Sequence, residues 1–167
     1  YYDEIVGITE NYMNEVNKRI GSNYKLFNYY GAPDADRVVI AMGSVCDTLE
    51  ETIDFLNAAG QKVGLIKVRL YRPFSKEHLL SALPKTVKSI TVLDRTKEPG
   101  AIGEPLFLDV ITALKGTEFG NTPVYGGRYG LGSKDTTPSH LIPVFDNMTL
   151  AQPKQGFTVA ITDDVTG

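Results

Sequence analysis

From Arg37 onward, short apolar runs alternate with segments of helical character, and this alternation constrains the fold more than any other feature of the chain. Runs typical of strands occupy 37–42, 62–70, 89–93, 122–125 and 157–161, and helical segments begin near Ser44, Ser75, Pro105 and Thr137. Strands that alternate with helices are typical of a parallel sheet covered on both faces. The sequence therefore predicts an α/β fold, an open and mostly parallel sheet of about five strands with helices on both faces.

The residues before this alternation predict a helix and a connector. Apolar side chains recur at helical spacing before a glycine stop at Gly21, namely Ile5, Ile8, Tyr12, Val16 and Ile20. We expect residues 1–21 to be a helical lead-in from a preceding domain, 22–36 a connector with turn residues, and 37–164 the α/β domain. A first residue other than Met, inside an expected helix, favours a piece of a longer polypeptide.

Composition excludes several classes of function. The net charge of −3 without a basic stripe argues against a nucleic-acid partner. No apolar run approaches the ~20 residues of a membrane span. The single cysteine excludes an internal disulfide and an iron–sulfur cluster held by this chain alone, and His78 and His140 lack the spacing of a zinc site. With no visible signal peptide and one cysteine, we expect a cytoplasmic protein.

The segment 89–105, SITVLDRTKEPGAIGEP, carries the strongest functional signal. An apolar run leads directly into four charged residues, and glycines and prolines then bend the chain: the charged residues are Asp94, Arg95, Lys97 and Glu98. In open α/β sheets, ligands usually bind at loops that follow the carboxyl ends of strands. This spacing predicts either an ion-pair cluster or a recognition loop, at an active-site rim or at a joint between domains.

Two arginines after another apolar strand form a second candidate. Arg69 and Arg72 follow the run 62–70, and arginine binds carboxylate or phosphate through two parallel hydrogen bonds. The alternative is a surface pair with little energetic consequence. We favour an anion or interdomain clamp, because Pro73 and Phe74 fix the direction in which the chain leaves the strand.

Glycine-rich turns supply the remaining candidates. The segment 127–134, GRYGLGSK, nearly matches a P-loop, but its Ser and Lys are transposed, which breaks that mechanism and favours a glycine loop packed on a neighbouring domain. Arg128 in this loop remains available to an anion. Ser44 begins a helix with Asp47 in a capping-box pattern, and we favour a plain turn there over an anion site. Cys46 shares the helix's apolar register, so we expect a buried small residue.

No catalytic constellation is recognisable. No Ser/His/Asp set or paired carboxylates can be assembled, so we predict no catalytic residue and no metal ligand. The candidates for anion or interdomain contacts are Ser44, Arg69, Arg72, Arg95, Lys97, Glu98 and Arg128.

Four of these segments together resemble a known family. They are RVVIAMGS (37–44), KVRLYRPF (67–74), VLDRTKEPGAIGEP (92–105) and GGRYGLGSKD (126–135). This combination resembles the second domain of pyruvate:ferredoxin (flavodoxin) oxidoreductase, a domain similar to the C-terminal domain of transketolase. The resemblance extends from about Tyr24 to Asp164.

The resemblance implies a parent enzyme that converts pyruvate, coenzyme A and an oxidised carrier to acetyl-CoA, CO₂ and reduced ferredoxin or flavodoxin. That enzyme would be a homodimer using thiamine diphosphate, Mg²⁺ and [4Fe–4S] clusters. In the family these groups belong to other domains, and this chain lacks both the cluster cysteines and a GDG-type thiamine motif. We therefore expect a non-catalytic domain that binds no cofactor itself, contacts the other domains of its polypeptide, and lies near the coenzyme A site.

Alternative functions stay open on the sequence. The glycine loop and the α/β alternation also suit a stand-alone anion- or nucleotide-binding module. A purely structural dimerisation domain is a third reading, because transketolase-type domains often dimerise in their relatives. Related parents with other activities exist as well, including fusions that accompany sulfite reduction.

Overall fold

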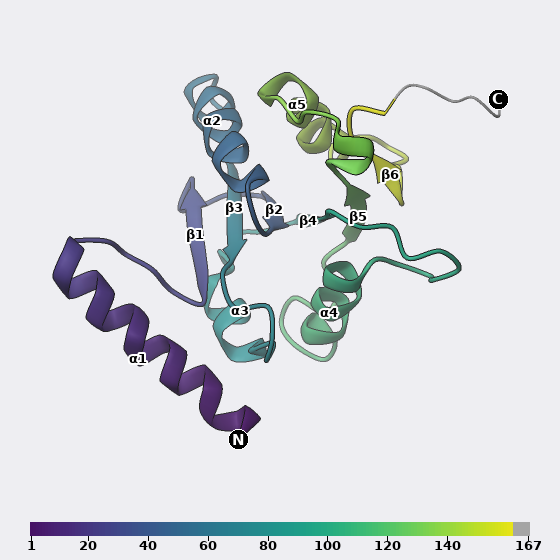
Figure 1. The fold of residues 1–167 in the computed structure, drawn as a ribbon. Coiled ribbons are helices and arrows are strands. Elements are labelled where there is room, and N and C mark those ends of the chain that lie inside the picture. Colours follow the sequence, from purple (N-terminus) through teal and green to yellow (C-terminus); the bar gives the residue numbers. More distant parts are fainter. Residues whose placement is uncertain (162–167) are drawn as a thin grey trace.

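The computed structural model describes residues 1–161, and Figure 1 shows their arrangement as a twisted sheet between two layers of helices. The helices are α1 (Tyr2–Ile20), α2 (Val45–Ala58), α3 (Lys76–Ala82), α4 (Pro105–Leu114) and α5 (Pro138–Asn147). The strands are β1 (Phe27–Gly31), β2 (Arg37–Ala41), β3 (Val63–Val68), β4 (Ser89–Asp94), β5 (Val124–Arg128) and β6 (Phe157–Thr158).

The sheet has the order β1-β3-β2-β4-β5-β6. All neighbouring strands pair in parallel except β1, which lies antiparallel to β3 at the edge. The predicted fold class is confirmed. The described residues contain six strands rather than about five, because β1 forms within the range 22–36 that the sequence assigned to a connector.

Alternate residues of the central strands face two separate apolar layers. On β2, Val38 and Ile40 point into the core beneath α3 and α4, while Val39 and Ala41 point into the core beneath α2 and α5. All four side chains are fully buried. A strand covered on both faces is apolar at every position rather than at alternate ones, which explains the continuous apolar runs of the sequence.

The predicted helix starts are confirmed, although the predicted capping box at Ser44 is wrong. α2 begins directly after Ser44, but the Ser44 side chain makes no capping hydrogen bond, so the capping box with Asp47 does not form. Ser75 likewise caps nothing, because its hydroxyl lies 2.6 Å from His78 Nδ1 instead. The backbone is already helical at Ser44, whereas at Ser75 it is still extended.

At the start of α5 a cap does form. His140 Nδ1 accepts a hydrogen bond of 3.3 Å from the Thr137 backbone N–H. The helix contains Pro143 and continues past it to Asn147. Only the first two residues of the expected strand 157–161 form a strand, β6. The expected domain end at residue 164 lies outside the described residues.

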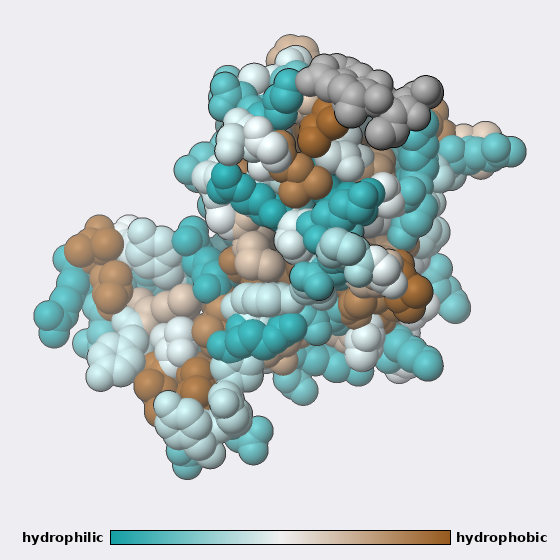
Figure 2. Space-filling model, turned by 45° about the vertical axis from the view of Figure 1, so that its right-hand side comes forward, coloured by the Kyte–Doolittle hydropathy of each residue, from teal (hydrophilic) through white to brown (hydrophobic). Residues whose placement is uncertain are grey.

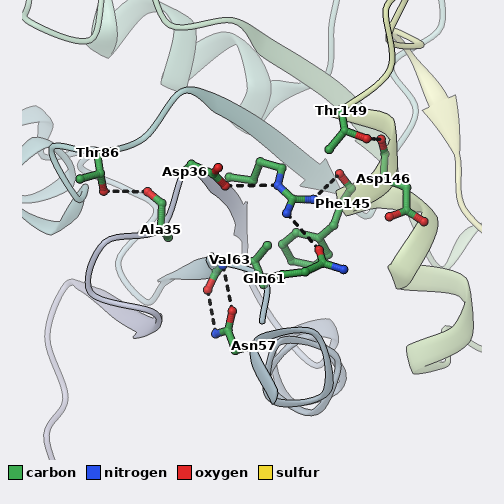
Figure 3. Close-up of polar contacts among 10 residues, drawn as sticks. Ala35, Asp36, Asn57, Gln61, Val63, Thr86, Phe145, Asp146 and Thr149 are labelled. Atoms are coloured by element: carbon green, nitrogen blue, oxygen red, sulfur yellow. Dashed lines mark hydrogen bonds and ion pairs between the residues drawn. The ribbon is translucent and has the colours of Figure 1, made fainter. Parts of the chain in front are cut away.

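The amino edge of the sheet is closed by polar contacts, which Figure 3 shows. Asn57 accepts a hydrogen bond from the Val63 backbone N–H at 2.9 Å and donates one to its carbonyl at 3.1 Å. The Arg37 guanidinium donates to Gln61 Oε1 at 3.0 Å and to the Phe145 carbonyl at 3.4 Å. This edge therefore joins α2, β2 and α5. No helix within residues 1–161 has both the length and the apolar character needed to cross a membrane.

Candidate functional site

The loops that follow β2, β4 and β5 meet at the carboxyl edge of the sheet, because these strands are parallel neighbours. β2 leads into α2 on one face, and β4 leads into α4 on the other, so the chain changes direction between them. Such a switch point is where open α/β sheets usually bind ligands. A cavity of about 230 Å³ lies here, lined by Ser44, Arg95, Tyr129, Lys134 and their neighbours.

Asp94 belongs to the core of this edge rather than to its surface. It is only 3% exposed, and its carboxylate accepts hydrogen bonds from the backbone N–H groups of Leu106 at 2.9 Å and Phe107 at 3.1 Å. Burial raises the pKa of Asp94, and the two N–H bonds oppose that shift. Asp94 therefore satisfies the first N–H groups of α4 and fixes both ends of the loop 95–104.

Glu104 and Arg128 form the second anchor of the same loop. Arg128 Nη1 lies 2.8 Å from Glu104 Oε1, and both side chains are mostly buried. The other Glu104 oxygen accepts a 2.7 Å hydrogen bond from the Glu98 backbone N–H. Arg128 also donates to Thr158 Oγ1 at 3.2 Å and to the Gly156 carbonyl. In this structure Arg128 has partners on two segments, at the start of α4 and at β6.

The remaining charges of the loop face solvent. Arg95, Lys97 and Glu98 are exposed, and none of the three forms an ion pair with another residue in the described part of the chain. Figure 1 shows this loop projecting away from the sheet between β4 and α4. Ile102, near its end, is 96% exposed. These three charges therefore form no ion-pair cluster in the described part of the chain, and a recognition role of the loop stays a prediction.

Arg69 and Arg72 have different partners. Arg69 Nε donates to Asn28 Oδ1 at 2.8 Å, and its guanidinium lies 4.7 Å from the Tyr24 ring centre. Arg72 lies 3.8 Å over the Tyr71 ring, and its Nη2 is 2.8 Å from Asp109 Oδ2, an ion pair without the alignment of a hydrogen bond. Each arginine thus braces the segment after β3 against a different neighbour.

The glycine loop after β5 packs against the end of β2. The Tyr129 hydroxyl donates a 2.8 Å hydrogen bond to the Met42 carbonyl, which fixes the start of the loop. A single 3₁₀ turn, Leu131–Ser133, follows, in which Gly132 and Ser133 have positive φ. The loop forms one wall of the cavity at the switch point, with Arg95 beside Gly130.

Cys46 is a core residue, as the apolar register predicted. It is 5% exposed, and burial raises the pKa of its thiol to about 11. A thiol with so high a pKa is a poor nucleophile and a poor metal ligand near neutral pH. Within residues 1–161 there is no group of three or more His, Cys, Asp or Glu side chains placed to hold a metal ion.

Sequence reasoning missed the partners that organise the site. These partners are Glu104, which pairs with Arg128, Asp109, which pairs with Arg72, and Tyr129, which bonds to the Met42 carbonyl. Each lies at least 24 positions from its partner in the sequence. The only signal for Glu104 was its position directly before Pro105, the first residue of a helix.

Known proteins match this chain along most of its length. The family model described as pyruvate:ferredoxin oxidoreductase core domain II matches residues 35–141. A pyruvate:ferredoxin oxidoreductase from Moorella thermoacetica is 57% identical over 99% of this chain, and a pyruvate-flavodoxin oxidoreductase from Enterobacter agglomerans is 53% identical over 99%. The chain spans only 14% of each of these relatives.

A solved structure shares the fold at much lower identity. A chain of the 2-oxoglutarate:ferredoxin oxidoreductase from Magnetococcus marinus aligns with a TM-score of 0.54 and 19% identity, covering 84% of this chain and 23% of that one. At this identity the likeness concerns the arrangement of helices and strands alone.

Proposed function

Because the chain belongs to the pyruvate:ferredoxin oxidoreductase core domain II family, we propose that it is a non-catalytic domain of a pyruvate:ferredoxin or pyruvate:flavodoxin oxidoreductase. Its parent would convert pyruvate, coenzyme A and oxidised carrier to acetyl-CoA, CO₂ and reduced carrier. The observation that carries this proposal is 53–57% identity along 99% of the chain to two such enzymes, in which it matches 14% of the length.

The chemistry of this reaction belongs to other domains in this proposal. Iron–sulfur clusters need several cysteine thiolates, whereas the chain has only Cys46, which is buried with a raised pKa. Among the described residues, no three or more His, Cys, Asp or Glu side chains gather where they could hold a metal ion. We propose that thiamine diphosphate, Mg²⁺ and the [4Fe–4S] clusters are held by other domains of the parent, and that the parent is a homodimeric, cytoplasmic enzyme.

The carboxyl edge of the sheet is the surface that would contact those domains. The loop 95–104 is fixed at its base by Asp94 and Glu104, yet it presents Arg95, Lys97, Glu98 and Ile102 to solvent. A loop whose two ends are fixed has less conformational freedom to lose when it binds. We assign to it the organisation of contacts with neighbouring domains, with Arg69 and Arg72 stiffening the adjacent segment.

Reversing the charge of Arg95 in the full-length polypeptide tests this assignment. We expect Arg95→Glu and Ile102→Asp each to lower pyruvate-dependent carrier reduction by about tenfold, the factor that 1.4 kcal/mol of lost contact energy produces. Lys85→Glu is the matched control, because Lys85 is an exposed lysine on the loop before β4, at the opposite edge. Wild-type activity in both loop variants would refute the interdomain role, and a full-length protein without pyruvate oxidation would refute the family function.

The cavity between Ser44 and Arg95 supports a second candidate, the binding of an anion such as a phosphate of coenzyme A. Its walls combine an arginine with the start of α2, where backbone N–H groups favour negative charge. Calorimetric titration of coenzyme A into the chain, with thiamine diphosphate and ATP as controls, tests this candidate. Heat seen only with coenzyme A, and lost in Arg95→Gln, would support it; no heat with any of the three would refute it for the isolated domain.

A further inference from the structure

α1 carries an apolar surface that nothing in the described chain covers. Its four residues follow each other every four positions and are strongly exposed: Ile8 51%, Tyr12 71%, Val16 41% and Ile20 66%. We call these residues the α1 stripe. None of the 19 residues of α1 is buried, and Figure 2 shows brown, apolar side chains on this helix at the lower left of the molecule.

A different side of α1 holds the helix to the domain. Val6 and Met13 pack against the core beneath α3 and α4. The Asn17 side chain accepts a 2.7 Å hydrogen bond from the Tyr24 backbone N–H, and Glu10 lies 3.3 Å from His78 Nε2. Successive helical residues are rotated by about 100°, so Ile8 and Tyr12 point about 100° or more away from Met13 and Asn17, whereas Ile20 lies nearer the direction of Met13. The orientation of α1 is therefore set by contacts that leave the stripe free.

The isolated chain is less stable with this stripe exposed to water than it would be with the stripe buried. Burying a side chain such as Ile or Val is worth about 1.5–3 kcal/mol, and a helix gains most of its stability from packing an apolar face. Contiguous apolar surface on a protein commonly marks an interaction site. The stripe thus indicates a partner whose own surface is apolar.

The size of the stripe decides between two kinds of partner. A 19-residue helix is about 28 Å long and ~10 Å wide, so pairing the stripe with its copy in a second chain would bury only ~600 Å² in total. Stable interfaces between separate chains bury at least about 1,200 Å². A surface within the same polypeptide needs much less area, because the linkage keeps its effective concentration in the millimolar range.

We propose that the α1 stripe docks onto an apolar surface of another domain in the same polypeptide. This inference rests on the proposed function, in which the chain is one domain of a longer enzyme. The α1 stripe would be a second docking surface, separate from the loops at the carboxyl edge of the sheet. The two relatives match 99% of this chain, α1 included, but the chain spans only 14% of their length.

Site-specific photocrosslinking in the full-length polypeptide tests this inference. The photoreactive residue p-benzoylphenylalanine replaces Tyr12 in one protein and Asn14 in a control. Asn14 is also exposed but points to the side of α1 opposite the stripe. We expect the Tyr12 probe to join α1 to a peptide outside residues 1–167 without changing the mass of the denatured chain, and the Asn14 probe to form no such link.

Three results would overturn the inference: a band at twice the chain mass, a link only to peptides within residues 1–167, or no link from Tyr12. Pyruvate-dependent carrier reduction is measured on the same samples before irradiation. Activity without the expected link would refute the docking of α1 while the proposed function stands, whereas absent activity in the unmodified full-length protein would refute the proposed function itself.

Discussion

Arg128 Nη1 lies 2.8 Å from Glu104 Oε1 and thereby ties the carboxyl end of β5 to the residue directly before α4. Glu104 in turn holds the Glu98 backbone N–H, and Arg128 donates to Thr158 of β6. One mostly buried ion pair thus connects β5, β6, α4 and the projecting loop 95–104. The exposed charges of that loop are positioned by residues that solvent scarcely reaches.

We expect Arg128→Met to lower the free energy of unfolding by about 3 kcal/mol, because it leaves the Glu104 carboxylate buried without a counter-charge. Arg128→Lys keeps the charge but loses the forked geometry that also reaches Thr158, so an intermediate loss is expected. Urea unfolding of the 167-residue chain measures both. The control is Arg95→Met, which removes an exposed arginine and should change stability by no more than about 0.5 kcal/mol. Equal stability of the Arg128 and Arg95 variants would contradict the anchoring role.

Asp94 gives a pH-dependent prediction. Asp94→Asn leaves one acceptor oxygen for two N–H groups and should cost about 1–2 kcal/mol of stability. Burial raises the pKa of Asp94 above its ordinary value, so the folded state retains the proton to a higher pH than the unfolded state. The stability that this proton contributes is present at low pH and lost as the pH rises through the raised pKa.

The stability difference between wild type and Asp94→Asn should therefore be larger at pH 4 than at pH 7, as thermal or urea unfolding at the two values would measure. If this stability difference is smaller at pH 4 than at pH 7, the hydrogen bonds from Leu106 and Phe107 affect the pKa of Asp94 more than its burial does.

The main elements of the fold were predictable because buried parallel strands are apolar at every position. β2, β3 and β4 each contain such a run, and burial on both faces is its physical cause. β1, with the sequence FNYYG, was missed because its residues are half polar and it pairs antiparallel at the edge, where no second neighbour requires apolar side chains on both faces.

The location of the site was predictable, but the roles of its residues were not. The carboxyl ends of parallel strands meet, so the charged segment after Leu93 had to lie at that edge. Asp94 and Arg95 are neighbours in sequence, yet one is buried and the other exposed, because β4 is covered on both faces and ends at Asp94, while Arg95 already belongs to the projecting loop. The partner of Arg128 lies 24 residues earlier, and no local pattern signals it.

Two glycines should respond in opposite ways to the same substitution. Gly31 has φ 115°, and a Cβ there would lie 2.5 Å from the Val63 carbonyl oxygen and 2.8 Å from Gly64 Cα, both backbone atoms. Gly31→Ala should therefore cost about 2 kcal/mol or more, through strain at β1. Gly7 lies inside α1, and a methyl group added there would meet nothing within 4 Å, so Gly7→Ala should stabilise by about 0.5–1 kcal/mol. Thermal unfolding compares the two, and a neutral Gly31→Ala would contradict the observed path of β1.

Cys46 should behave as an inert thiol in the folded chain. Burial raises its pKa to about 11, so alkylation by iodoacetamide at about pH 8 should be slow in the folded protein and rapid in urea. Because the folded state holds the thiol proton above its ordinary pKa, this contribution to stability is complete below about pH 9 and lost as the pH rises through about 11. Mass spectrometry follows the alkylation, and rapid modification of the folded chain at that pH would contradict the assignment of Cys46 to the core.

Hydrogen exchange of the loop 95–104 tests the central claim most directly, because that claim makes the loop a contact with neighbouring domains. The backbone amides of residues 100–103 are compared between the 167-residue chain and the full-length polypeptide, with the exposed residues Lys85 and Thr86 before β4 as the internal reference. We predict fast exchange of the loop in the isolated chain and at least about tenfold slower exchange in the full-length protein, while the reference residues are unchanged. Equal exchange of the loop in both proteins would contradict its role as an interdomain contact.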